Sequence, residues 1–325
     1  MLLFATARGQ DSFTKRIPPP VSPEAKLDME NKLKEAQTQY EANPKSADAM
    51  IWVGRRLAYL GRFVESIDIY TKGIKRFPAD ARFYRHRGHR RITLRQFKLA
   101  IADLKKAAQL IKGKPDEIEP DGQPNARNVP TSTLQFNIWY HLGLAYYLTG
   151  QNQKALDAYN ECLKVSKSPD RLVSTTHWLY MTLRRLNRND EAAKALEPVT
   201  EGMDVIENSG YYHLVLMYKG ILPLERLLDE AQGDSAASHS VLYGIGNWHE
   251  YNGRLELALP IFRKIVSGTQ WTSFGYIAAE AALNESLERV RKKYNISAPN
   301  RIRFTPSEFE EWSYYSASSP HLSTR

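Results

Sequence analysis

Small and apolar residues recur along this chain with a helical period, and the whole pattern then returns at a longer interval. Two prolines that each follow a helical stretch, Pro44 and Pro78, stand 34 residues apart. Six residues set the pattern between them: Gly54, Leu57, Gly61, Ser66, Tyr70 and Gly73. When the sequence is shifted by 34 residues, small residues align with small residues, as in the pairs Gly54–Gly88, Ser66–Ala100 and Gly73–Ala107. This internal period predicts stacked helical repeats.

Each repeat is interpreted as two antiparallel helices joined by a tight turn. Small residues at facing positions let the two backbones approach closely, and large aromatic residues fill the space beside them. Gly61 and Gly150 are expected where a first helix ends in a turn of positive φ. Pro78 and Pro169 are expected to stop the second helices. Because one unit cannot bury its apolar face alone, the units must stack.

A clearer copy of the pattern lies at 136–169. It carries Trp139, Leu142, Gly143, Tyr146, Gly150, Ala155, Tyr159, Cys162 and Pro169. Trp-x-x-Leu-Gly-x-x-Tyr, followed by Ala-x-x-x-Tyr and a closing Pro, resembles the tetratricopeptide repeat. The resemblance implies an all-α fold, a right-handed superhelical solenoid of antiparallel helix pairs, over about 24–294.

The copies after 169 are less regular. Residues 173–206 keep the spacing, but Tyr180 replaces the small residue of the first helix. Residues 209–232 are interpreted as a degenerate pair, with helices expected over 211–219 and 224–232. Residues 239–268 recover the pattern, and 268–294 start like another unit and end in a charged helix suited to capping the array.

The chain is expected to divide into five parts. Residues 1–23 form a disordered lead-in or the remnant of a truncated signal, and 24–114 hold a capping helix and two basic units. Residues 115–135 form a Pro-rich loop, either a tolerated surface insertion or a flap or hinge at the groove. Further units fill 136–294, and 295–325 is a tail. In this tail Ser307 and Glu310 make a capping-box pattern, so a short helix and a frayed end both remain open.

Composition narrows the class of protein. Hydrophobic residues make up 42% and charged residues 25% of the 325 residues, as in an ordinary folded protein. The single cysteine, Cys162, excludes a disulfide framework within the chain and is interpreted as a core residue. No apolar run is long enough for a membrane span. Residues 1–10 fit either the end of an export signal or a frayed terminus, so export and a cytoplasmic location both remain open.

The positive charge is concentrated in the first two repeats. Residues 47–114 hold 17 Lys and Arg against 5 Asp and Glu, a net charge of +12. Because the whole chain has a net charge of +9, the remaining residues together carry −3. Arg82, Arg85 and His89 are spaced to share one helix face. The resemblance implies that this face looks into the concave groove, near Arg55. It also implies that Asn137, Tyr140 and Tyr147 line the same wall.

Such a wall would attract a carboxylate, an acidic peptide or another anion, although a solvated basic face without a ligand is the alternative. The carboxylate clamp that some tetratricopeptide domains use for chaperone tails is absent, since Ile51 and Arg55 stand where it needs Lys and Asn. Arg87 replaces the usual Leu and is expected to pair with Asp103 rather than with a ligand.

No catalytic or phosphate-binding motif occurs, and the eight histidines are scattered, so we expect no enzyme, no cofactor and no metal site. The leading hypothesis is a protein-interaction scaffold that binds a partner segment, with acidic segments favoured, in its groove. The alternative is binding of a polyanion, either nucleic acid or an anionic surface, through the basic repeats. That binding would weaken steeply with salt.

Overall fold

A computed structural model describes residues 16–294, with side chains up to residue 289. The described part of the chain folds entirely as α-helices apart from one isolated β-bridge, between Ile118 and Thr133. This confirms the predicted all-α helical-repeat fold. The predicted signal remnant at 1–10 and the tail with Ser307 and Glu310 lie outside the described residues.

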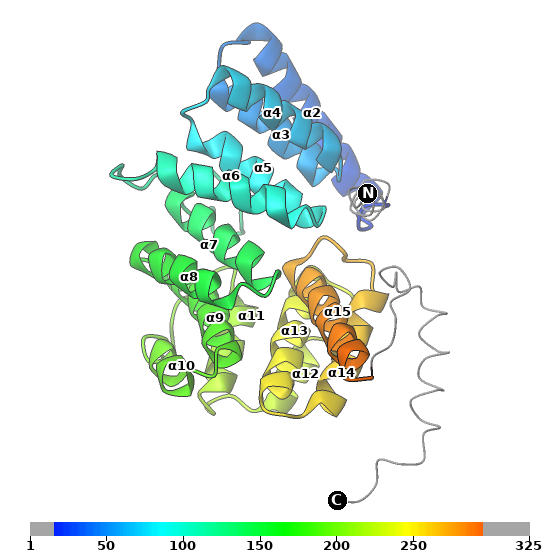
Figure 1. The fold of residues 1–325 in the computed structure, drawn as a ribbon. Coiled ribbons are helices and arrows are strands. Elements are labelled where there is room, and N and C mark those ends of the chain that lie inside the picture. The colour runs from blue at the N-terminus through cyan, green and yellow to red at the C-terminus, as the bar shows by residue number, and fades with distance from the viewer. Residues whose placement is uncertain (1–15, 295–325) are drawn as a thin grey trace, which may run out of the picture. The chain divides into compact units, whose positions relative to one another are not determined.

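The helices follow one another as antiparallel pairs (Figure 1). A leading helix, α2 (Pro23–Ala42), packs on the first pair. The first helices of the pairs are α3 (Ala47–Tyr59), α5 (Ala81–Thr93), α7 (Leu134–Tyr147), α9 (Pro169–Arg185), α11 (Ser209–Tyr218) and α13 (Ala236–Tyr251). Their partners are α4 (Phe63–Arg76), α6 (Phe97–Leu110), α8 (Asn152–Val165), α10 (Asn189–Leu196), α12 (Leu224–Glu230) and α14 (Leu255–Ser267).

One long helix, α15 (Phe274–Tyr294), follows the last pair. The chain divides into two compact units after Ala282, within this helix. Residues 268–294 therefore do not repeat the helix pair that their sequence begins to resemble.

Helix boundaries follow from capping chemistry. Most first helices start at a Ser, Thr or Asp whose side chain accepts from a backbone N–H of the first turn, as Ser46 does from Ala49 and Thr133 from Phe136. Pro169 is one of the first residues of α9, so the prediction that it stops the preceding helix is wrong. A proline suits that position because its missing N–H would have no partner there. Pro78, in contrast, directly follows the end of α4.

The turns inside all six pairs share one geometry. A residue with φ between 58° and 79° stands between the helices, and the next N–H donates to a carbonyl five residues back. The positive-φ residue is Gly61, Arg95, Gly150, Asn187, Gly220 or Gly253. The positive φ predicted for Gly61 and Gly150 is therefore present. Arg95 and Asn187 are not glycines, and an ordinary L-residue such as Arg95 enters this region at a cost of about 1 kcal/mol or more, whereas Asn tolerates it better.

Close approach of the helices explains the glycines of the repeat. A Cβ on Gly143 would lie 2.6 Å from a ring carbon of Tyr159, and one on Gly246 would lie 2.6 Å from a ring carbon of Phe262. Tyr180, which replaces the small residue in α9, is accommodated because its ring stacks on Tyr218 of α11, with centroids 4.4 Å apart. The fourth pair still packs, although α10 is only 8 residues long.

Early and late parts of the first unit also contact each other. Trp271 donates from its indole Nε1 to the carbonyl of Ile17 at 2.7 Å, and its ring packs edge-on against Phe63. Arg95 pairs with Glu280 at 2.7 Å. The side chain of this strained turn residue therefore joins the second repeat to α15.

Candidate binding site on the first helices

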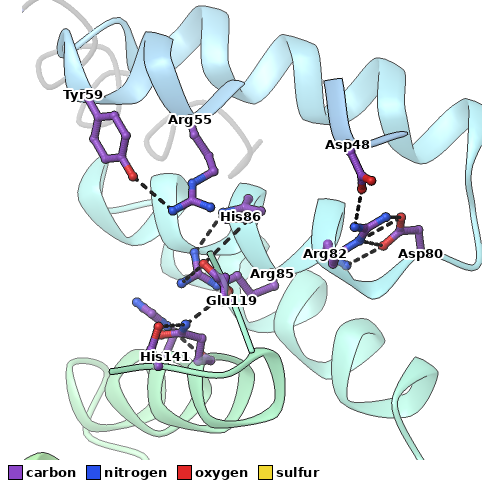
Figure 2. Close-up of polar contacts among 11 residues, drawn as sticks. Asp48, Arg55, Tyr59, Asp80, Arg82, Arg85, His86, Glu119 and His141 are labelled. Atoms are coloured by element: carbon purple, nitrogen blue, oxygen red, sulfur yellow. Dashed lines mark hydrogen bonds and ion pairs between the residues drawn. The ribbon is translucent and has the colours of Figure 1, made fainter. Parts of the chain in front are cut away.

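Helix α5 supplies three of the predicted binding residues, and the structure separates one from the others. Arg82 lies between Asp80 and Asp48, with guanidinium-to-carboxylate distances of 2.6 and 2.5 Å (Figure 2). These two carboxylates raise the pKa of Arg82, Asp80 having the larger effect. Its charge is balanced within the chain, which leaves little attraction for an external anion.

Arg85 is buried and is held by a residue of the long segment between α6 and α7. Its Nη2 lies 2.9 Å from Oε1 of Glu119, and both side chains are about one-tenth exposed, at 9% and 10%. Asn137 of α7 donates to the other oxygen of Glu119 at 3.1 Å. Glu119 therefore brings Arg85 and Asn137, two of the predicted residues, onto one carboxylate. Figure 2 shows the contact of Glu119 with Arg85.

Arg55 of α3 faces the same region without a carboxylate of its own. Its Nη2 donates to the hydroxyl of Tyr59 at 3.2 Å, and its guanidinium lies 4.4 Å from the centre of the Trp52 ring. Among the described residues, no ion pair to an acidic side chain is formed by Arg55.

His89 lies in a layer of rings between α5, α7 and α15. Its ring centre is 4.2 Å from that of His141 and 5.4 Å from that of Phe274. Tyr140 packs against His141 and Phe274 in the same layer. Burial, followed by the charges of Arg90 and His141, holds the pKa of His89 well below its usual value. Both histidines of this layer are therefore uncharged at neutral pH.

Tyr147 lies in a different cluster. The hydroxyl of Tyr147 lies 3.0 Å from the hydroxyl of Tyr243 and 3.1 Å from the side-chain oxygen of Asn247, and both of these residues belong to α13. The guanidinium of Arg185 lies 4.3 Å from the centre of the Tyr147 ring. The structure thus gathers Arg55, Arg85, His89, Asn137 and Tyr140 on one side of α3, α5 and α7, here called the inner face, and leaves Arg82 and Tyr147 outside it.

The segment between α6 and α7 is pinned across the inner face. Its base is closed by backbone hydrogen bonds from Glu119 to Ser132 and from Leu134 to Glu117. On α3, Arg56 donates to the carbonyl of Gly122 at 2.7 Å. At its far end Asn125 donates to Glu207 and Arg127 pairs with Asp204. The segment is therefore a tethered strap rather than a free surface loop.

Sequence reasoning missed Glu119 and Arg90. Arg90 follows His89 on α5, and its guanidinium lies 5.7 Å from the centre of the Phe63 ring. Burial, together with the charges of Arg85 and Arg55, lowers the pKa of Arg90 to about 10. The alternating acids Glu117, Glu119 and Asp121, which directly follow a strongly basic region, were the available signal for a strap that docks by charge.

The expected pairing of Arg87 is present. Arg87 donates to both oxygens of Asp103, at 2.9 and 2.7 Å, and Arg91 reaches the same carboxylate at 2.6 Å. Asp103 is buried. These two arginines therefore serve the packing of α5 on α6.

The described residues contain neither a metal site nor a membrane-spanning helix. Within them, no group of three or more His, Cys, Asp or Glu side chains is arranged to hold a metal ion. None of the helices that the structure describes combines the length and apolarity of a membrane span.

Comparison with known proteins identifies one repeat of the chain. Residues 136–168, the third helix pair, match the model of the tetratricopeptide repeat. No curated protein matches the sequence. The match confirms the tetratricopeptide-repeat resemblance at the third pair, and the neighbouring pairs have the same helix-pair geometry.

Solved structures with similar folds share little sequence. A tetratricopeptide repeat protein from Parabacteroides merdae is 14% identical, with 85% of this chain and 99% of that chain covered and a TM-score of 0.45. YrrB, described as a TPR protein with an unusual peptide-binding site, is 15% identical over 76% of this chain and 97% of its own, with a TM-score of 0.41. The MamA protein is 16% identical over 61% and 87%, with a TM-score of 0.41.

Proposed function

We propose that this protein is a non-enzymatic interaction scaffold that holds a segment of a partner protein against the inner face. Tetratricopeptide repeats serve in general as protein-interaction modules, and one of the similar structures is described as having a peptide-binding site. A carboxylate held by Arg85 and Asn137 illustrates the kind of contact an acidic segment would make.

The observation that carries this proposal is the strap itself. Residues 117–122 lie on α3, α5 and α7 without helical structure, and they are held through a side chain, at Glu119, and through a backbone carbonyl, at Gly122. Proteins that bind extended peptides use main-chain hydrogen bonds for affinity and side-chain contacts for specificity. The inner face thus already has the chemistry to hold a peptide.

A site-specific crosslink tests this proposal. A photoreactive amino acid replaces Gln123, an exposed residue of the strap beside Arg56, and the matched control replaces Leu99, an exposed residue of α6. We expect a discrete partner protein to be captured at position 123 in cell extract and not at position 99, in low and high salt. Equal capture at both positions, or none at 123, would contradict binding at this face.

A polyanion remains the second candidate, and a different surface favours it. The second helices α4 and α6 and the residues just after them carry exposed cations with no acidic partner among the described residues: Lys72, Lys75, Arg76, Lys98, Lys105, Lys106, Lys112 and Lys114. Binding there would lose affinity steeply with salt, because each neutralised phosphate releases counterions. Retention of nucleic acid at low salt, abolished by Lys105→Glu/Lys106→Glu, would support this alternative.

A further inference from the structure

Three arginines of α3 and α5 lie close enough for their charges to interact, and one of them holds a carboxylate. Arg55, Arg85 and Arg90, here called the arginine cluster, come from α3 and α5. Burial is the main cause that lowers the pKa of Arg85 and of Arg90, and the charge of Arg55 lowers both further, as expected for like charges close together. Of these three arginines, Glu119 forms an ion pair with Arg85.

Two members of the arginine cluster have no carboxylate within the described chain. Arg55 bonds only to the Tyr59 hydroxyl and lies over Trp52, and Arg90 has only the face of Phe63. Even Arg85, whose side chain is nine-tenths buried, keeps its Nε without a hydrogen-bond partner. A buried cation without a partner is costly, so proteins retain such an arrangement where a ligand completes it.

The strap is an incomplete occupant of this cluster. Asp121, two residues after Glu119, is partly buried and forms no ion pair with Arg55, although the charge of Arg55 acts on it. Burial and the neighbouring charge of Glu207 raise the pKa of Asp121. The strap therefore satisfies one arginine of three and leaves two guanidinium groups for a better ligand.

We infer that the arginine cluster is a recognition site for acidic side chains of a partner segment, and that Glu119 is its resident, displaceable occupant. The partner segment carries at least two carboxylates close together, one replacing Glu119 on Arg85 and the other pairing with Arg55 and Arg90. Three charge-assisted contacts in place of one give such a segment the advantage over the strap. This inference rests on the proposed function and specifies the partner's chemistry.

A peptide with the strap's own sequence, residues 115–124, is the probe. It is labelled with a fluorophore and titrated by anisotropy into the full chain and into its Glu119→Gln variant. We expect Glu119→Gln to bind the peptide about tenfold or more tightly than the unchanged chain, because the resident carboxylate no longer competes. A peptide with its acids changed to amides should not bind either chain.

Arginine variants locate the contact. In the Glu119→Gln background, Arg90→Gln and Arg55→Gln should each weaken peptide binding about tenfold, since each loses a charge-assisted hydrogen bond. Arg82→Gln is the matched control on the same helix, and it should bind unchanged because Asp80 and Asp48 already hold Arg82. Melting curves of each variant establish that it is folded.

The inference is overturned if neither chain binds the acidic peptide, or if Arg82→Gln weakens binding as much as Arg90→Gln. Crosslinking at position 123 distinguishes failure of the proposed function from failure of the carboxylate specificity. A partner captured there whose segment is not acidic leaves the proposed function standing and removes the carboxylate specificity. If the acidic peptide binds but no partner is captured at position 123, the carboxylate specificity stands and the proposed function is contradicted.

Discussion

Glu119→Gln is the substitution that tests whether the strap is docked as described. Gln keeps the shape of Glu and one acceptor oxygen, but it removes the negative charge from Arg85. Breaking a buried ion pair by removing one partner costs about 3–5 kcal/mol. Because the amide can still accept a hydrogen bond from Arg85, we expect a loss below that range, about 2–3 kcal/mol in the free energy of unfolding.

Urea denaturation followed by tryptophan fluorescence measures this loss. A local readout adds to it, since amide exchange at Glu119 and Leu134 reports the hydrogen bonds that close the base of the strap. The matched control is Glu65→Gln, which removes an exposed pair with Arg62 and should change stability by less than about 0.5 kcal/mol.

A double-mutant cycle assigns the effect to the pair. If Arg85 and Glu119 interact directly, Arg85→Gln/Glu119→Gln should cost less than the sum of the two single substitutions by about 1.5 kcal/mol or more. The docked strap would be refuted if Glu119→Gln behaves like Glu65→Gln and amide exchange at Leu134 does not change.

Three further predictions concern the scaffold. Asp103→Asn should destabilise the chain by about 3 kcal/mol in urea, because Arg87 and Arg91 lose their shared buried carboxylate, and Arg87→Leu/Asp103→Leu should recover part of that loss. Gly143→Ala should cost about 1–3 kcal/mol through the clash with Tyr159, against about 1 kcal/mol for Gly150→Ala, where only the positive φ opposes a side chain. Burial lowers the pKa of His177 from 6.5 to about 3, so the folded state binds fewer protons than the unfolded state below pH 6.5. Stability should therefore fall by up to about 1.4 kcal/mol per pH unit as the pH drops from there toward 3, and His177→Gln should flatten the slope.

The fold could be predicted because its determinants are local. A tight turn needs a residue of positive φ, and a close helix pair needs a small residue, so Gly61, Gly143 and Gly150 mark the repeat within a short stretch of sequence. Irregular units were harder. Tyr180 breaks the pattern, and only the position of Tyr218 in the folded chain explains how it fits.

The candidate site could be predicted only in part. Repeat spacing indicates which side chains face inward, and Arg85, His89 and Asn137 do lie together. It does not indicate what fills the space they face. Tyr147 is covered by residues of α13, and Arg85 is paired with a carboxylate from a segment that belongs to no repeat. Contacts of that kind depend on the path of the whole chain.

The contacts between Trp271 and Ile17 and between Arg95 and Glu280 have a consequence for how the chain folds and evolves. In an open repeat array each unit touches only its neighbours, so repeats can be gained, lost or unfolded from an end one at a time. Here the side chains of Arg95 and Glu280 meet across 185 residues. Such contacts raise the contact order, which slows folding. They also join early and late repeats into one cooperative unit, in which duplicating or deleting a single repeat would pull these partners out of register.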